Sequence, residues 1–394
     1  MPREDLSRSG RSRIEPGGPV KTGTGLRPER IAPLDGIRGL AILAVVLMHY
    51  DAFLDRHVFF QHILTSIFDY GWAGVDLFFV LSGFLITRIL LATREASNYF
   101  RAFYARRVLR IFPLYYASLL LLFGVLIPKM STEPSPTAPE IFRYFLYLQN
   151  WFMPLQWSGQ YWSLAVEEQF YLMWPLVVYN FERKRLLHIA IGGSILSLLL
   201  RSALVIAGAN PVLILTNVFT RLDALLMGSA CACLMQQNGF EDRLRRPARW
   251  FWCAPLASFP ALRLAAGSFH NTAPVILSVG YTIVGVSCAG VLLTAVLTAG
   301  SRSLLQRFLT HPAMRMLGKY SYAAYIWHVL VRVTVLYLEQ TWLRVSTPWF
   351  VNIPLMFAIT IGVSMLSHAA IERPFLSLKR YFEPAIRTAA ARAS

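Results

Sequence analysis

The chain has 394 residues, of which 55% are hydrophobic and only 15% are charged, and its formal net charge is +17. Soluble domains carry about a quarter charged residues, so the composition excludes an ordinary soluble protein. Apolar runs of about 20 residues recur along the chain, and they predict an all-α integral membrane protein. The positive charge would suggest nucleic acid in a soluble protein, but its placement in loops indicates another role, and no nucleic-acid partner is expected.

The composition also predicts two terminal tails, a membrane domain between them, and the state of the cysteines. Residues 1–32 are basic and contain Pro, Gly and Ser without an apolar core or cleavage site, so they predict a disordered cytoplasmic tail rather than a signal peptide. Residues 33–377 form the predicted membrane domain, and 378–394 form a second cytoplasmic tail. The four cysteines all fall in apolar stretches, which favours small buried hydrophobes over disulfides or zinc ligands, and no metal site is expected.

The apolar runs predict a bundle of about ten transmembrane helices and leave no room for a soluble domain. The seventh is the weakest because Pro255, Pro260 and Arg263 interrupt it. The predicted spans are 34–54, 66–90, 104–127, 162–181, 186–207, 212–236, 248–267, 273–298, 315–338 and 348–371.

Loop charges predict the orientation of this bundle. With both termini and the returning loops on one side, that side holds 29 of the 38 Lys and Arg residues and the opposite loops hold 4. Such a bias indicates that both termini are cytoplasmic, and it would also attract anionic lipid. The longest outer loop, 128–161, is rich in Pro and aromatic residues, and we expect it to lie across the outer mouth as an interfacial segment or lid.

The first span contains an arginine, Arg38, and a histidine, His49, eleven residues apart. Eleven residues make about three helical turns, so both side chains project from one face, roughly 16 Å apart along the axis. Ionisable residues inside a membrane are costly and are therefore candidates for a functional site.

The second span carries Asp76 near its outer end and the pair Ser82-Gly83 deeper in the membrane. A buried aspartate needs a partner or a role. Small residues such as Ser82 and Gly83 let helices approach closely, so packing is the preferred interpretation for them.

The third span opens from the cytoplasm with Arg106, Arg107 and Arg110, of which the last two share a helical face. Guanidinium groups bind phosphate in a bidentate manner, so this cluster suits a donor that carries phosphates. Ordinary topology-determining charge explains it equally well.

The fourth span carries two adjacent carboxylates, Glu167 and Glu168, about five residues in from Trp162 at the outer interface. His49 lies at a similar depth, so one of the two glutamates could orient its imidazole as a general base requires. Adjacent helical residues point about 100° apart, so we expect only one of them to face the site. A structural Glu–His pair is the alternative.

Further polar residues lie in the sixth and ninth spans and at the end of the tenth. Arg221 and Asp223 could form an internal ion pair that holds helices in register, and His328 places a second histidine near the membrane midplane. Glu372-Arg-Pro-Phe375 is most simply a helix stop and anchor.

Seven sequence blocks, in this order, resemble the bacterial acyltransferase-3 family of membrane O-acyltransferases, and the resemblance covers residues 33–377. Each block is weak alone, but their order is specific. The blocks are Leu34-Asp-Gly-Ile-Arg-Gly-Leu with His49, Gly74-Val-Asp-Leu-Phe-Phe-Val-Leu-Ser-Gly-Phe-Leu-Ile86, Arg107-x-x-Arg110, Trp162-Ser-Leu-x-Val-Glu-Glu-Gln-Phe-Tyr171, Arg221-Leu-Asp-Ala224, Tyr325-x-Trp-His328 and Glu372-Arg-Pro-Phe375.

The resemblance implies transfer of an acyl group, usually acetyl, from cytoplasmic acyl-coenzyme A to a carbohydrate hydroxyl at the bacterial inner membrane. It implies that His49, Glu167, Glu168 and Arg38 serve catalysis and that Arg107 and Arg110, with Arg38, bind the co-substrate, with no permanently bound cofactor. Some members carry a fused extracytoplasmic domain; this chain resembles the stand-alone form, for which a separate extracytoplasmic partner protein is conceivable.

The residues are compatible with three hypotheses about the function of the chain. In an acyltransferase, His49 would deprotonate the acceptor hydroxyl or form an acyl-histidine relay. In a proton-coupled transporter or glycan flippase, a relay would use His49, Glu167, Asp223 and His328, although this leaves the paired arginines unexplained. A structural scaffold is disfavoured by the number of intramembrane charges.

Overall fold

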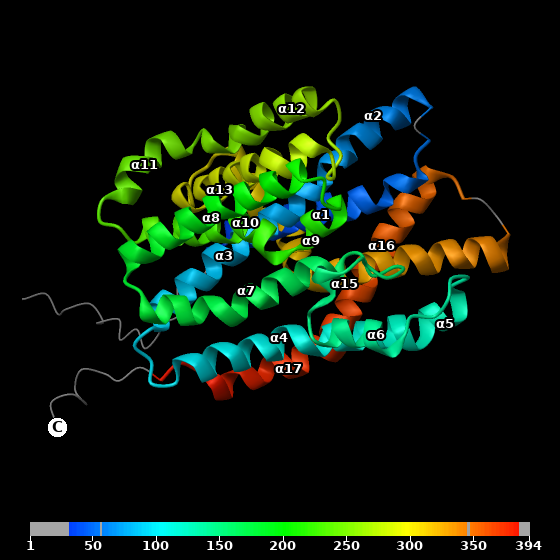
Figure 1. Cartoon of the computed structure of the whole chain (residues 1–394), viewed down its shortest axis with the longest axis horizontal. Coiled ribbons are helices and arrows are strands. Elements are labelled where there is room, and N and C mark those ends of the chain that lie inside the picture. The colour runs from blue at the N-terminus through cyan, green and yellow to red at the C-terminus, as the bar shows by residue number, and fades with distance from the viewer. Residues whose placement is uncertain (1–30, 56, 345–346, 386–394) are drawn as a thin grey trace, which may run out of the picture.

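The computed structural model describes residues 31–55, 57–344 and 347–385, and all regular structure within these ranges is helical (Figure 1). The predicted all-α membrane fold is confirmed. The helices are α1 (Pro33–Tyr50), α2 (Phe59–Phe68), α3 (Ala73–Thr93), α4 (Tyr99–Leu121), α5 (Ile127–Met130), α6 (Ala138–Phe145), α7 (Tyr161–Asn180), α8 (Arg183–Ile206), α9 (Pro211–Thr216), α10 (Val218–Met235), α11 (Phe240–Ala248), α12 (Ala254–Ala266), α13 (Tyr281–Leu297), α14 (Leu304–Thr310), α15 (Pro312–Leu338), α16 (Trp349–Ser367) and α17 (Arg373–Ser377).

Eight helical stretches of the described chain are long and apolar enough to cross a membrane. They correspond to eight of the ten predicted spans. The fourth predicted span is α7, whose 20 residues are long enough to cross but include the two glutamates. The seventh is α12, which has 13 residues and reaches only about 20 Å, less than the hydrocarbon thickness. Because prolines interrupt this region, it forms α11 and α12 in succession rather than one crossing helix.

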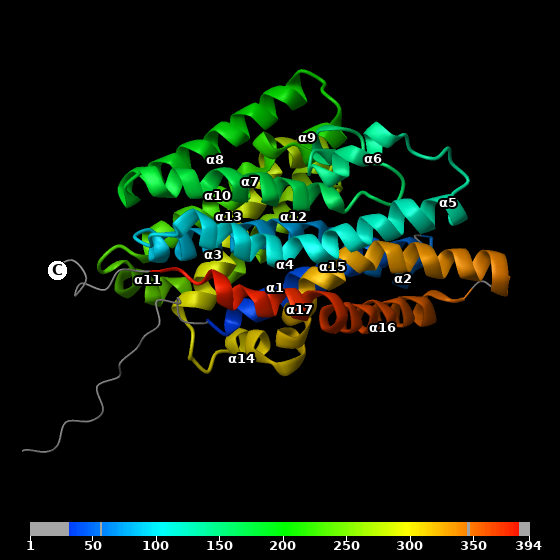
Figure 2. The ribbon, with the colours of Figure 1, turned by 90° about the horizontal axis from the view of Figure 1, so that it is seen from below.

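The long helices lie side by side, and the connections gather at the two ends of the bundle (Figure 1, Figure 2). Helices α4 and α8 begin, and α3 ends, at one end, which carries the arginines between 88 and 110 and those between 183 and 185. We call it the basic end. The segment with α5 and α6 lies at the opposite end (Figure 1), which the chain reaches by the single crossing of α4.

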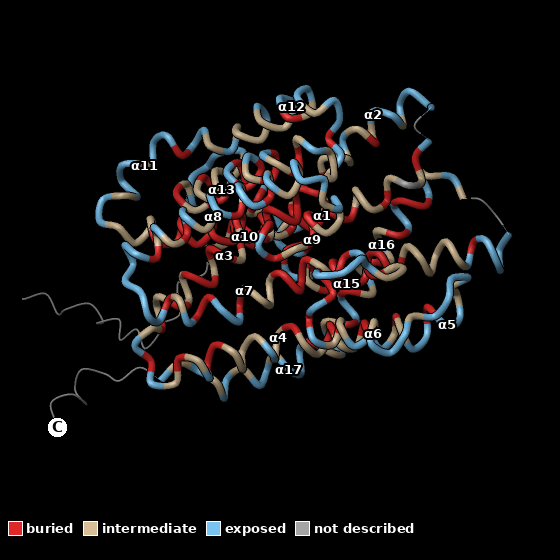
Figure 3. The backbone as a smooth tube through the Cα atoms, in the orientation of Figure 1, coloured by how far each residue is buried: buried red, intermediate tan, exposed pale blue. Residues whose placement is uncertain are grey.

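The core contains close backbone contacts between helices: α15 packs on α1, α1 on α3, and α3 on α10. Buried residues are concentrated on these helices (Figure 3). A Cβ atom added at Gly83 of α3 would lie 1.8 Å from the carbonyl oxygen of Leu225 in α10. One added at Gly318 of α15 would lie 1.7 Å from the carbonyl oxygen of Asp35 in α1. The predicted packing role of Gly83 is therefore confirmed, because only glycine permits this approach.

The outer segment 128–161 packs into the bundle. Gln149 and Asn150 are buried, and the amide of Asn150 bonds with that of Gln169 in α7, at 2.8 and 3.3 Å. The amide nitrogen of Gln149 donates to the carbonyl oxygen of Tyr161 at 2.8 Å. The segment thus lies at the end of the bundle opposite the basic end, and its polar side chains are anchored to α7. That this end is the outer one stays a prediction.

The C-terminal part differs from the predicted helix stop after residue 371. The helix continues through a π-helical turn at His368–Glu372 and through α17 to Phe382. Asn98 then holds the chain beyond it, donating to the carbonyl oxygen of Glu383 at 2.9 Å and accepting from the amide of Ala385 at 2.8 Å. Most of the predicted N-terminal tail, residues 1–30, and residues 386–394 lie outside the described ranges.

The contact at Gly83 predicts a position-specific effect of a single methyl group. We expect Gly83→Ala to lower the thermal unfolding midpoint in detergent, with a loss of about 1–3 kcal/mol typical of overpacking. Gly192→Ala in α8 is the matched control, because nothing lies within 4 Å of the added Cβ. Equal melting midpoints for both variants would contradict the packing proposed for α3 and α10.

Candidate functional site

A cavity of about 1140 Å³ opens into the protein from the basic end. Its walls come from the start of α1, nearly the whole length of α3, the first halves of α4, α7 and α15, and the C-terminal segment. Basic side chains surround it near the entrance: Arg38, Arg88, Arg106, Arg107, Arg110 and Lys379. The cavity therefore joins a cationic entrance to the middle of the membrane domain.

Three of the predicted site arginines line this cavity together, although they come from different helices. The first turns of α4 supply Arg107 and Arg110, and α1 supplies Arg38. A guanidinium nitrogen of Arg38 lies 3.2 Å from Asp35 Oδ1 one turn earlier. The guanidinium carbon of Arg107 lies 5.0 Å from the ring centre of Tyr171, which orients it by a cation–π contact.

Both predicted glutamates line the cavity, which differs from the expectation that only one of them would face the site. The hydroxyl of Ser82 donates to Glu167 Oε1 at 2.5 Å, so this serine binds a site residue in addition to lying at a helix contact. Glu168 Oε1 is buried and has no hydrogen-bond partner among the described residues. An unpartnered buried carboxylate oxygen that faces a cavity is available to a ligand.

His49 does not line the cavity, and the expectation that Glu167 or Glu168 orients it is wrong for the described contacts. Its Nδ1 lies 2.8 Å from the carbonyl oxygen of Val45, which can only accept. Nδ1 therefore carries the proton and donates, and Nε2 keeps the free lone pair. A backbone carbonyl, in place of a carboxylate, sets the tautomer.

The partner of the His49 ring is His328, at a centroid distance of 4.6 Å and an interplanar angle of 78°. His328 is fully buried, its Nδ1 donates to the carbonyl oxygen of Tyr325 at 2.7 Å, and its Nε2 has no partner among the described residues. The two predicted histidines are thus brought together, each with its Nε2 in the basic form.

Tyr325 connects the cavity to these histidines. It lines the inner wall of the cavity, where its hydroxyl bonds with Ser163 and donates to the carbonyl oxygen of Gln160 at 3.1 Å. Its ring centre lies 5.6 Å from that of His328. The order from the entrance inward is therefore the arginines, the glutamates, Tyr325, His328 and His49.

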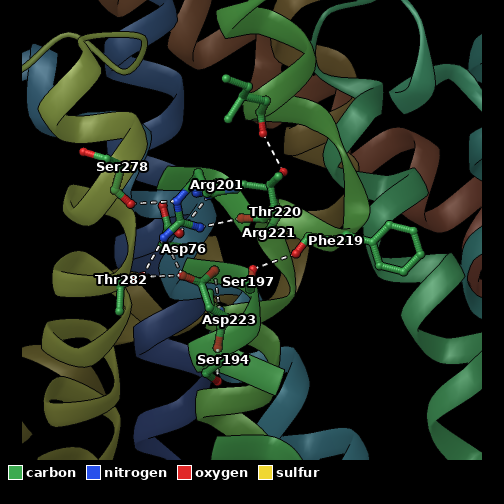
Figure 4. Close-up of polar contacts among 12 residues, drawn as sticks. Asp76, Ser194, Ser197, Arg201, Phe219, Thr220, Arg221, Asp223, Ser278 and Thr282 are labelled. Atoms are coloured by element: carbon green, nitrogen blue, oxygen red, sulfur yellow. Dashed lines mark hydrogen bonds and ion pairs between the residues drawn. The ribbon is translucent and has the colours of Figure 1, made fainter. Parts of the chain in front are cut away.

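Two buried ion pairs join α3, α8 and α10 beside this region (Figure 4). Asp76 Oδ1 accepts from Arg221 at 2.8 Å, and Asp223 Oδ2 accepts from Arg201 at 2.9 Å. Arg221 and Asp223 therefore do not bind each other, and the prediction that they form an ion pair is wrong. Residues two apart on a helix face in different directions, so each finds its partner on a neighbouring helix.

Additional contacts surround the Arg201–Asp223 pair, whereas Asp76 Oδ2 and the Nε and Nη1 atoms of Arg221 have no hydrogen-bond partner among the described residues. Arg201 also donates to the carbonyl oxygens of Thr220 and Ser278, and Thr282 bonds both Arg201 and Asp223 (Figure 4). The guanidinium carbon of Arg221 lies 3.7 Å from the ring centre of Tyr281. Further hydrogen bonds of this kind, which Arg201 and Asp223 have, lower the cost of burying a charged pair.

Sequence reasoning missed three residues that shape the site. Arg201 was counted only as an arginine inside a span, although its burial alone required an acidic partner. Tyr325 was present in a noted block, but its contacts with Ser163 and His328 depend on helix packing. Lys379 fell in the predicted tail, yet it lines the cavity entrance.

Comparisons with known proteins place the chain among acyltransferases. A family model described as an acyltransferase domain matches residues 31–369. The chain is 28% identical, over 87% of its length, to the peptidoglycan O-acetyltransferase OatA of Listeria monocytogenes and to the putative peptidoglycan O-acetyltransferase YrhL of Bacillus subtilis. It is 25% identical to a putative O-acetyltransferase of Staphylococcus aureus over 88% of its length.

The chain covers 55%, 54% and 57% of these three relatives, so it spans about half of their length. The comparison with solved structures found no match.

The ion pairs predict strong coupling between Asp76 and Arg221. We expect Asp76→Leu to lower stability by about 3–5 kcal/mol because it leaves a buried arginine uncompensated. Adding Arg221→Leu should recover much of this loss, since the double variant buries neither charge. Thermal unfolding of both single variants and the double variant in detergent measures the coupling, and additive losses would contradict it.

Proposed function

The chain belongs to the acyltransferase-3 family, whose model matches residues 31–369, and on this premise we propose that it is a membrane O-acyltransferase. It moves an acyl group, acetyl in the simplest case, from acyl-coenzyme A to a hydroxyl of a carbohydrate. The observation that carries this proposal is the cavity with a cationic entrance at the basic end and carboxylates and Tyr325 at its inner wall, next to the histidine pair.

The cavity suits acyl-coenzyme A in size and charge. Ligand pockets commonly measure about 300–1,000 Å³, and about 1140 Å³ is available here. The phosphates of the donor bind Arg107 and Arg110, with Arg38 from the opposite wall, because guanidinium groups form charge-assisted hydrogen bonds with phosphate. The pantetheine arm then extends inward, and the thioester reaches the wall formed by Ser163 and Tyr325.

His49 performs the proton transfer. Its Nε2 takes the proton of the acceptor hydroxyl, the oxygen attacks the thioester carbonyl, and collapse of the adduct breaks the carbon–sulfur bond. The imidazolium returns the proton to the departing thiolate. An acyl-histidine relay on the same nitrogen is the variant route: the imidazole attacks the thioester first, and the acceptor hydroxyl then takes the acyl group.

Tyr325 and His328 lie between the cavity and His49 in this proposal, so the thioester meets His49 only when Tyr325 moves. The hydroxyl of Tyr325 is bonded to Ser163 and Gln160. Rotation of this side chain would join the cavity to the two histidines. Donor binding therefore has to displace these hydrogen bonds before transfer.

The acceptor is proposed from chemistry and from relatives. Two relatives are named for peptidoglycan O-acetylation, so a cell-wall or other surface glycan is the first class to examine. His49 lies toward the outer end of α1, which favours an acceptor that arrives from outside the bacterial inner membrane. A separate extracytoplasmic protein could present it.

The transporter alternative has weaker support. A proton relay through Asp223 requires that its carboxylate be free to titrate, but Arg201 and Thr282 both bind it. The four groups of that relay therefore do not form one continuous chain in the described contacts.

Removing the proposed base should stop the reaction. We expect His49→Ala to lower the acetylation rate about 10²–10⁴-fold, while acetyl-coenzyme A binding, measured by calorimetry, stays unchanged. His188→Ala, at an exposed position of α8, is the control and should keep full activity. A His49→Ala protein with the rate of the control would refute the assignment of His49.

Removing one donor arginine should weaken donor binding selectively. We expect Arg110→Ala to raise the KM for acetyl-coenzyme A about tenfold or more, as loss of a charge-assisted hydrogen bond implies, with kcat little changed. Arg185→Ala, an exposed arginine at the basic end outside the cavity, should leave KM unchanged. Measuring both variants again with acetyl-dephospho-coenzyme A shows whether Arg110 binds the phosphate that this analogue lacks. If the KM of Arg110→Ala equals that of the parent protein with each of the two donors, Arg110 does not bind the donor.

A further inference from the structure

A second cavity, of about 1030 Å³, lies at the basic end between α11 and the connection from α13 to α14. None of its lining residues lines the first cavity. The proposed acyl transfer therefore does not use it. We call it the α11 groove.

Three arginines form one side of the α11 groove: Arg245, Arg246 and Arg249. Positions 245 and 249, and positions 246 and 249, are four and three residues apart, so the three side chains project toward one side. All three are exposed, and none forms an ion pair within the part of the chain that the structure describes. Their charge is available to an anion.

The other side of the α11 groove is apolar. It contains Leu297, Leu305, Phe308 and Trp252, and Leu304 at its edge is 82% exposed. Trp250, 62% exposed, lies next to Arg249 in the chain and is in contact with its guanidinium group. Exposed tryptophans beside arginines are typical of the interface between lipid headgroups and acyl chains.

We propose that the α11 groove binds an anionic phospholipid of the cytoplasmic leaflet. The phosphodiester lies against the three arginines, and an acyl chain lies along Leu297, Leu304 and Phe308. A soluble anion such as coenzyme A would satisfy the arginines but leave the apolar side in contact with water. An anion attached to a hydrocarbon chain matches both sides, and the basic end places the groove at the leaflet whose lipids are negatively charged.

The experiment reconstitutes the full chain in nanodiscs that contain equal amounts of phosphatidylglycerol and phosphatidylcholine. Native mass spectrometry of the released protein then counts the lipids that remain bound. We expect the parent protein to retain phosphatidylglycerol in preference, and Arg245→Gln/Arg246→Gln/Arg249→Gln to lose at least about tenfold of that preference. Phe308→Ala should reduce retention of phosphatidylglycerol without changing the charge.

The control removes the same charge elsewhere at the basic end, with Arg183→Gln/Lys184→Gln/Arg185→Gln at the start of α8. It should keep the preference. Equal loss in the control would assign the effect to general basic charge and overturn the proposal, as would displacement of the lipid by acetyl-coenzyme A. The triple arginine variant of the α11 groove should have the same KM for acetyl-coenzyme A as the parent. The lipid proposal and the proposed acyl transfer can therefore fail independently of each other.

Discussion

Ion pairing inside the bundle is the constraint on which the other features depend. Asp76 binds Arg221 and Asp223 binds Arg201, and together these four side chains connect α3, α8 and α10 where water is excluded. In a low-dielectric interior, a single unpaired charge costs several kcal/mol, so the helices can pack in only one register. Helix α3 carries both Asp76 and Ser82, and the same register therefore places Ser82 against Glu167 at the wall of the first cavity.

The site has two parts that the chain builds by different means. At the basic end, long cationic side chains from α1 and α4 surround an open cavity and can adjust to a flexible donor. At the inner end, two histidines are held by backbone carbonyl oxygens one helical turn away. A carbonyl sets the tautomer without adding a charge, so the basic nitrogen of each ring remains neutral and available. This division matches a reaction that binds a polyanion at one place and moves a proton at another.

Sequence reasoning predicted those features that depend on position along the membrane normal. Apolar runs identified eight of the ten predicted spans. The family resemblance grouped Arg38 with Arg107 and Arg110, and all three line one cavity. Neither the apolar runs nor the resemblance could determine how each helix is rotated about its axis, and the expected pairing of His49 with a glutamate failed for this reason. Glu167 and Glu168 face the cavity, while His49 lies farther from the entrance and contacts His328 of α15. The partner of Arg221 was likewise set by a neighbouring helix.

The hydrogen bonds of Tyr325 also affect whether protons could leak across the membrane through the protein. A protein that admits a cytoplasmic substrate to mid-membrane and an external one to the same point is, in effect, two half-channels. With Tyr325 bonded to Ser163 and Gln160, and His328 fully buried behind it, those halves remain separate at rest. In the proposed reaction, this separation would keep water from hydrolysing the thioester. In the proposed enzyme, the same contacts would also keep protons from crossing through the histidines, so idle copies would not dissipate a membrane potential.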